Sequence, residues 1–153
     1  MKNDMRPQLR FPGFADAWAE KKVKEVATIV GGNTWKPSDY RQNGDYLVVT
    51  ISNVSGDAFI DDKIGNHVFC EPDNAYTLSE NDILISLTGN VGRVSKMTAA
   101  KGVLNQRVGK IIPNGTIVPD FLFYQLNNPI FESTMIYAGQ APKWASFFMK
   151  QSY

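Results

Sequence analysis

The sequence has few of the residues that enzymes most often place at a reactive centre. It contains one cysteine, Cys70, and one histidine, His67. A lone cysteine cannot form an internal disulfide, and two such residues are too few for a Cys/His metal cluster. The sequence also has no Gly-x-Gly-x-x-Gly or Walker-type phosphate loop. We therefore expect no catalytic residue, no metal ligand and no cofactor.

Long apolar runs are absent as well. No stretch of about 18 uninterrupted apolar residues occurs, and residues 1–10 lack the apolar centre of a secretion signal. We therefore expect no membrane segment and a reduced, cytoplasmic setting. Because 43% of the 153 residues are hydrophobic and 12% are aromatic, residues 1–153 should fold as a single domain with a sizeable core.

Acidic residues are missing from one stretch of the chain. The formal net charge is only +1, yet no Asp or Glu occurs between Asp82 and Asp120, and residues 45–82 carry many acids and the single base Lys63. This distribution favours a polyanionic partner such as DNA, although two solvated faces of opposite charge would also produce it. If about four cations of the acid-free stretch met phosphates, log affinity would fall with log salt at a slope of about −3 to −4. The cations in the stretch are Arg93, Lys96, Lys101, Arg107 and Lys110.

Short strands dominate the predicted secondary structure. A short helix should precede the first of them, and Gly, Pro, Asn and Asp separate the others. No helix of crossover length lies between the strands, which argues against a parallel doubly wound sheet. After Pro119, two segments with helical apolar spacing are broken by Asn127-Asn128-Pro129, which predicts a helical hairpin. We expect an α+β fold in which a barrel-like or coiled β domain is followed by a C-terminal α-helical hairpin. The expected strands lie near residues 28–30, 46–51, 59–60, 68–69, 83–87, 91–94, 106–108 and 111–112.

Candidate DNA-binding residues lie in the loops of this pattern. Asn90 stands between Gly89 and Gly92, which tolerate positive φ, so Asn90 and the adjacent Arg93 could contact bases or merely form a tight hairpin. The amides of Asn105 and Gln106 suit adenine, or they could satisfy buried backbone instead. The rings and cations of residues 35–41 could bind nucleic acid or cap the core. The full candidate set is Lys36, Tyr40, Arg41, Asn53, Ser55, Thr88, Asn90, Arg93, Lys96, Lys101, Asn105, Gln106 and Arg107.

A nuclease is the enzymatic alternative. Asp61-Asp62-Lys63 contains the acid-x-Lys pair that metal-dependent nucleases use, with a carboxylate for Mg²⁺ and an ammonium for the developing charge. The same residues lie between short strands and are equally typical of a turn. His67 has no partner at a spacing that indicates catalysis.

Several segments, taken in order, resemble a known family. They are residues 9–14 with Trp18, residues 31–34, residues 78–86 with Gly89 and Gly92-Arg93, residues 104–108 and residues 121–126. Their order and spacing over residues 9–140 resemble a target recognition domain of a type I restriction-modification specificity subunit. The resemblance implies a non-catalytic, sequence-specific reader of double-stranded DNA with a distorted β-helix-like barrel and a following α-hairpin.

The resemblance also implies partners. In such subunits two recognition domains each read one half of a bipartite site, and long helices between them dock methyltransferase subunits. Residues 141–153 depart from the family pattern as a divergent tail, so assembly with methyltransferase, and possibly restriction, subunits is expected only where the full complex forms. The alternatives are the small nuclease and a degenerate domain that acts as a protein-interaction module. The target bases do not follow from sequence, because readout depends on side-chain placement and DNA shape.

Overall fold

A computed structural model describes residues 19–138 and 148–151 of the chain. The aromatic residues 9–14 and Trp18 lie outside the described residues, as does most of the tail. In chain order the elements are β1 (Ala19–Lys22), α1 (Val23–Val26), β2 (Ala27–Gly31), a short 3-10 helix (Pro37–Asp39), β3 (Tyr46–Val49), β4 (His67–Val68), β5 (Thr77–Leu78), β6 (Ile83–Ser86), β7 (Val94–Lys96), β8 (Gly102–Leu104), β9 (Val108–Pro113), α2 (Pro119–Leu126), α3 (Pro129–Ala138) and β10 (Phe148–Gln151).

The strands form two four-stranded sheets and one two-stranded ribbon. The first sheet has the order β2, β9, β6, β7 and is antiparallel throughout, and the second has the order β4, β3, β8, β5. β1 pairs with β10, so residues 19–22 and 148–151 lie side by side. The expected α+β class is confirmed. Within the described residues neither sheet closes on itself, so the barrel-like part of the prediction is not confirmed.

The second sheet contains a parallel strand pair. β3 and β8 run parallel, with Leu47 opposite Gly102 and Val49 opposite Leu104. Between β3 and β8 the chain forms β4 and β5 of the second sheet and then β6 and β7 of the first. Strands and loops therefore provide the crossover that a helix provides in a doubly wound sheet.

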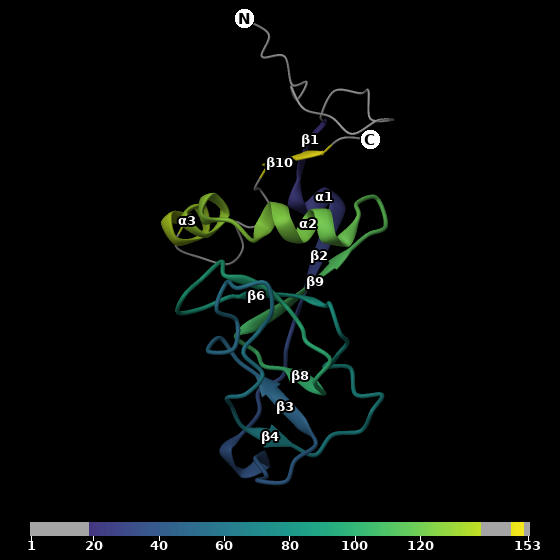
Figure 1. The fold of residues 1–153 in the computed structure, drawn as a ribbon, viewed down its shortest axis with the longest axis vertical. Helices are drawn as coiled ribbons and strands as arrows, with labels where there is room; N and C mark the ends of the chain where they lie inside the picture. Colours follow the sequence, from purple (N-terminus) through teal and green to yellow (C-terminus); the bar gives the residue numbers. More distant parts are fainter. Residues whose placement is uncertain (1–18, 139–147, 152–153) are drawn as a thin grey trace, which may run out of the picture.

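The alternating direction of side chains along β6 explains why the first sheet is covered on both faces. Ile83 and Ile85 of β6 belong to the core beneath the helices, whereas Leu84 points to the opposite face and joins the core between the two sheets. Successive strand residues face opposite sides, so a strand that is buried along its whole length must be covered on both. Figure 1 shows the resulting order, with α2 and α3 on one side of β6 and β9 and with β3, β4 and β8 on the other.

The predicted helical hairpin is confirmed. Pro119 opens α2, where its missing N–H costs no hydrogen bond. Asn127 ends α2, and the Asn128 Oδ1 accepts the N–H groups of Ile130 and Phe131 at 2.9 and 3.0 Å, which caps α3. Leu122, Phe123, Leu126, Phe131 and Met135 are buried against the first sheet.

Other boundaries differ from prediction. Residues 91–92 and 106–107 are turns rather than strands, and Phe59 makes only an isolated bridge to Lys96. The sequence did not predict β8. This strand begins at Gly102, and glycine usually interrupts strands. In the structure an added Cβ at Gly102 would lie 2.6 Å from Met97 Cε, so the glycine admits a buried methionine. Among the described residues no helix is long and apolar enough to cross a membrane.

Candidate nucleic-acid interface

Several loops leave the two sheets at the same place. Gly31 at the end of β2 lies opposite Gly109 of β9, and Val108 lies opposite Ser86 at the end of β6. The loops after β2 and β6 and the loop before β9 must therefore begin as neighbours. The β8–β9 connection also accompanies the end of β3, because the Asn105 N–H donates to the Val49 carbonyl at 3.2 Å.

Backbone hydrogen bonds hold these loops together. The Asn33 N–H donates to the Leu104 carbonyl at 3.0 Å, and the Gln106 N–H donates to the Asn33 carbonyl at 2.9 Å. The Leu87 N–H donates to the Arg107 carbonyl at 2.9 Å. A Cβ at position 32 would lie 2.4 Å from the Asn105 carbonyl oxygen, so this approach requires Gly32. The loops form one bonded unit.

The exposed polar side chains of this unit form what we call the loop surface. Three segments of the chain contribute to it: first the loop after β2, then residues 87–93, and third the turn at residues 105–107. Thr34 Oγ1 donates to Gln106 Oε1, which ties the first segment to the third. Thr34 was not among the predicted residues. Its position two residues after the Gly31-Gly32 pair is the feature of the sequence that could have indicated it. The loop surface comprises Thr34, Thr88, Asn90, Gln106 and Arg107, all of which are exposed.

The loop that presents Asn90 has the expected backbone. Gly89 and Gly92 adopt φ of 68° and 87°, a region that favours glycine, and Asn90 between them is exposed. Ser86 closes the base of the loop, because its hydroxyl donates to the Asn90 carbonyl and accepts the Arg93 N–H at 3.1 Å. Residues 87–93 thus form a tight hairpin between β6 and β7, and that hairpin exposes an amide.

Asn105 lies beneath this surface. It is half-buried, and its Oδ1 accepts the Arg107 N–H at 3.1 Å. This local bond shapes the turn that presents Gln106 and Arg107, which is the structural role that the sequence left open for an amide at this position.

Three of the five cations in the acid-free stretch form internal ion pairs. Arg93 Nε lies 3.1 Å from Glu132 Oε1, and Lys96 Nζ lies 2.6 Å from Asp120 Oδ1. Lys110 Nζ lies 2.7 Å from Asp82 Oδ2. The acids stand just outside the stretch in sequence. Within the described residues, no ion pair involves Lys101 or Arg107.

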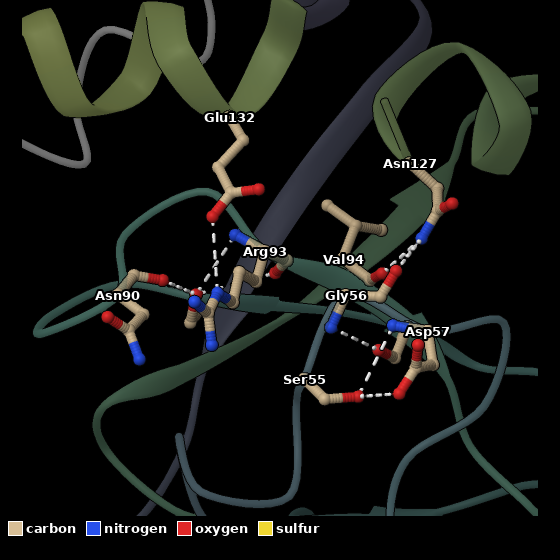
Figure 2. A network of polar contacts seen from close by, with 10 residues as sticks. Ser55, Gly56, Asp57, Asn90, Arg93, Val94, Asn127 and Glu132 are labelled. Atoms are coloured by element: carbon tan, nitrogen blue, oxygen red, sulfur yellow. Dashed lines mark hydrogen bonds and ion pairs between the residues drawn. The ribbon is translucent and has the colours of Figure 1, made fainter. Parts of the chain in front are cut away.

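The ion pair of Arg93 with Glu132 (Figure 2) and that of Lys96 with Asp120 belong to a contact that we call the hairpin seam, where the α2–α3 hairpin meets the β6–β7 hairpin. Asn127 Nδ2 donates there to the Gly56 and Val94 carbonyls at 2.8 and 2.6 Å. The Lys96 side chain is only 12% exposed, and its Nζ lies 4.8 Å from the centroid of the Phe123 ring. This burial leaves Lys96 outside the interface that we propose below. The seam comprises Arg93, Lys96, Asp120, Asn127 and Glu132.

Asn53 and Ser55 also have internal partners. Asn53 is fully buried; its Oδ1 accepts the Thr50 N–H at 2.7 Å, and its Nδ2 donates to the Asp61 and Ile64 carbonyls at 2.8 Å each. A side chain with no exposed surface cannot reach a duplex, so the structure corrects the prediction that Asn53 binds DNA. The Ser55 hydroxyl donates to Asp57 Oδ2 at 2.8 Å beside the hairpin seam.

Three further candidates, Tyr40, Arg41 and Lys101, lie at the other end of the second sheet. Lys101 precedes β8, whereas Asn105 follows it, and Lys101 Nζ lies 5.7 Å from the Tyr46 ring centroid. Tyr40 packs against the same core cluster as Tyr46, so it caps the core as the sequence allowed. Arg41 Nη1 donates to the Ser38 and Tyr40 carbonyls at 2.6 and 2.8 Å. Tyr40, Arg41 and Lys101 are therefore separate from the loop surface, whereas Lys36 is exposed only two residues after Thr34.

The acid-x-Lys motif forms a turn. The Lys63 N–H donates to Asp61 Oδ1 at 3.1 Å, and Thr98 Oγ1 donates to Asp62 Oδ2 at 2.7 Å. In the part of the chain that the structure describes, no three His, Cys, Asp or Glu side chains are grouped to hold a metal ion. Burial, followed by the charge of Asp45, raises the pKa of the Cys70 thiol, which disfavours the nucleophilic thiolate.

Comparison with known proteins identifies the family of this chain. Residues 15–143 match a family model described as "Type I restriction modification DNA specificity domain". A comparison with curated proteins found no match. Among solved structures, the chain resembles an HsdS subunit from Thermoanaerobacter tengcongensis, with a TM-score of 0.67 and 17% identity over 95% of this chain.

Two further structures have the same fold. One is a type I restriction-modification system S subunit from M. genitalium, with a TM-score of 0.66 and 11% identity over 97% of this chain. The other was described for complex assembly and conformational transition of the type I R-M system, with a TM-score of 0.66 and 16% identity over 95% of this chain. This chain spans 35%, 37% and 36% of the three solved chains respectively.

Proposed function

The chain belongs to the type I restriction modification DNA specificity domain family, and on that premise we propose that it is a sequence-specific reader of double-stranded DNA without catalytic activity of its own. The observation that carries the proposal is the loop surface. Loops that are distant in sequence converge there, and they expose amides, hydroxyls and a guanidinium that are typical of side chains that bind base edges and phosphates.

The roles of the side chains follow from their chemistry. The amides of Asn90 and Gln106 can each pair with the N6 and N7 edge of adenine in the major groove. Arg107 can span a guanine edge or bind a phosphate. Thr88 and Thr34 add hydroxyls that donate or accept. In this proposal Asn105 supports the surface from below, and Lys36, exposed two residues after Thr34, can add a phosphate contact. Arg41 and Lys101 reach DNA only if the duplex extends past the second sheet.

We further propose that this domain reads one half of a bipartite site. It spans about a third of the solved relatives, so a second recognition domain would supply the other half, and methyltransferase and possibly restriction subunits would supply catalysis. Tyr124, Ile130 and Tyr137 are large side chains that the helical hairpin leaves exposed. If these side chains form one continuous apolar patch, that patch is the surface that a protein partner would cover.

Selection from a randomised duplex pool tests the proposal. The chain should enrich particular base pairs, and Asn90→Ala should reduce the preference at some of them by about 1 to 3 kcal/mol. Asn43→Ala is the matched control, because Asn43 is exposed in the turn before β3, at the opposite end of that strand from Val49 and the Asn105 turn. If the parent chain enriches no sequence, the protein-interaction alternative replaces the reader.

A second experiment addresses the nuclease. Incubation of the purified chain with duplex DNA and Mg²⁺, or with a methyl donor, should leave the DNA unchanged. Cleavage that requires Mg²⁺ and is lost in Asp62→Ala would instead assign the acid-x-Lys turn a catalytic role.

A further inference from the structure

We propose that Glu132 of α3 is a positioning residue that fixes the 87–93 loop through Arg93, so that the helical hairpin governs base discrimination without touching DNA. The inference rests on the proposed function, because it concerns how accurately the loop surface is presented. It assigns Arg93 a different task from the base contact that the sequence suggested, since the guanidinium is turned toward a carboxylate on the helix.

The loop rests directly on α3. Arg93 Nε donates to Glu132 Oε1 at 3.1 Å. One residue earlier, Gly92 is buried with φ of 87°, and an added Cβ there would lie 2.6 Å from Met135 Cβ. Glu132 and Met135 are three residues apart and therefore share one helix face. The loop and the helix thus meet through a polar contact and a close-packed contact side by side.

Ser86 transmits this contact to the exposed amide. Its side chain is fully buried, and its hydroxyl bonds at once to the Arg93 N–H and to the Asn90 carbonyl. Its backbone also pairs with the loop, because the Ser86 N–H donates to the Arg93 carbonyl and the Gly92 N–H donates to the Ser86 carbonyl, each at 3.0 Å. Figure 2 shows Glu132 above Arg93 and Asn90 to the left of Arg93. A displaced Arg93 must therefore shift Asn90.

The ion pair itself contributes little to folding. The Arg93 and Glu132 side chains are 36% and 34% exposed, and pairs that solvent reaches to this extent stabilise a protein only weakly. Base readout is far more sensitive, because a bidentate amide contact has strict geometry. The expected consequence of breaking the pair is lost discrimination in a folded protein.

Three variants of the chain separate geometry from charge. Glu132→Ala removes the acceptor of Arg93 and one negative charge. Glu132→Gln removes the same charge but keeps an oxygen that can accept from Arg93 Nε. Glu80→Ala makes the same substitution at an exposed glutamate in the turn before β6, at the opposite end of that strand from the 87–93 loop. The probes are the duplex that the parent chain enriches most and the same duplex with its preferred bases scrambled.

Glu132→Ala should lower the ratio of the two affinities about threefold to tenfold, as expected for coupled residues in one network, and should speed hydrogen exchange of the amides in residues 86–93. Glu132→Gln and Glu80→Ala should keep the ratio within about twofold of the parent. The lost negative charge should raise the affinity of all three variants for both duplexes alike, because charge acts on DNA of any sequence.

Other outcomes overturn the inference. An undiminished ratio in Glu132→Ala would show that Arg93 does not depend on its partner, and an increased ratio would show that Arg93, once released, reads bases itself. Equal loss in Glu132→Ala and Glu132→Gln would assign the effect to charge rather than position. A parent chain that enriches no duplex would defeat the proposed function and this inference together, whereas a parental preference that survives Glu132→Ala defeats the inference alone.

Discussion

The loop surface and the hairpin seam each take residues from the same acid-free stretch of sequence, yet the cations of that stretch have opposite surroundings in the two regions. Arg107 is exposed on the loop surface, where within the described residues it forms no ion pair. Lys96 lies in the seam against Asp120 and the Phe123 ring. Eleven positions apart in the chain, the two side chains face solvent and core respectively.

This difference shows that a stretch of sequence with basic but no acidic residues need not form a positively charged surface. The acidic residues that pair with these cations lie before or after the stretch in sequence, and the fold brings them into contact with it. Asp120 and Glu132 lie on the helical hairpin, and Asp82 immediately precedes β6. The local charge is therefore partly neutralised before any DNA approaches, which lowers the number of phosphates that the stretch can bind.

Asn53→Ala should have the largest effect on stability, because Asn53 is fully buried and its side chain bonds to three backbone groups. The substitution leaves the Asp61 and Ile64 carbonyls and the Thr50 N–H without their partner. We expect the free energy of unfolding to fall by about 2 to 4 kcal/mol, measured by urea denaturation. The exposed Asn66, changed to Ala, should alter it by about 0.5 kcal/mol or less. Parental stability in Asn53→Ala would refute the structural role.

Lys96→Ala should have an intermediate effect. It removes the ion pair to Asp120, which solvent weakens because that carboxylate is 70% exposed. It also removes the cation over Phe123 and the packed stem of the side chain. Together these losses should lower the free energy of unfolding by about 1 to 2 kcal/mol.

The matched control for this comparison is Lys101→Ala, since Lys101 is exposed and should contribute about 0.5 kcal/mol or less. Thermal melting of both variants measures the difference. A Lys101 variant that melts lower than the Lys96 variant would reverse the distinction between a seam cation and a surface cation.

Sequence predicted those parts of the fold that local chemistry decides. Pro119 and the Asn127-Asn128-Pro129 break determine the hairpin, because a missing N–H and a side-chain cap act within one helical turn. Gly89 and Gly92 predicted the positive φ of their loop for the same reason. These features need no knowledge of distant residues.

Contacts between distant segments were not predictable in this way. The Arg93 pair joins residues 39 positions apart, and it depends on the helical hairpin docking against the β6–β7 hairpin. Asn53 shows both cases in one side chain. Its bond to Thr50 is a local turn contact, whereas its bonds to the Asp61 and Ile64 carbonyls depend on how the next loop folds back. The sequence therefore predicted Asn53, an asparagine in a polar turn, to bind DNA, whereas in the structure Asn53 is a buried residue.

The salt dependence of DNA binding provides the smallest and most discriminating test. If the three paired cations remain paired, only Arg107 of the stretch is left for phosphates on the loop surface, and the slope of log affinity against log salt should be about −1, or about −2 if the duplex extends past the second sheet to Lys101. This is shallower than the value of about −3 to −4 that the sequence suggested. Arg107→Gln should make the slope less steep by about one unit if its guanidinium meets a phosphate. Lys110→Gln should change it little, because Lys110 already pairs with Asp82.

Titration of one duplex over a series of salt concentrations measures all three slopes. A parental slope of about −4 would mean that ion pairs such as Lys96 with Asp120 open when DNA binds. In that case the hairpin seam would be part of the DNA interface, and the separation between the two regions would hold only for the unbound chain. A slope that responds to Arg107→Gln but not to Lys110→Gln would instead locate the phosphate contact on the loop surface.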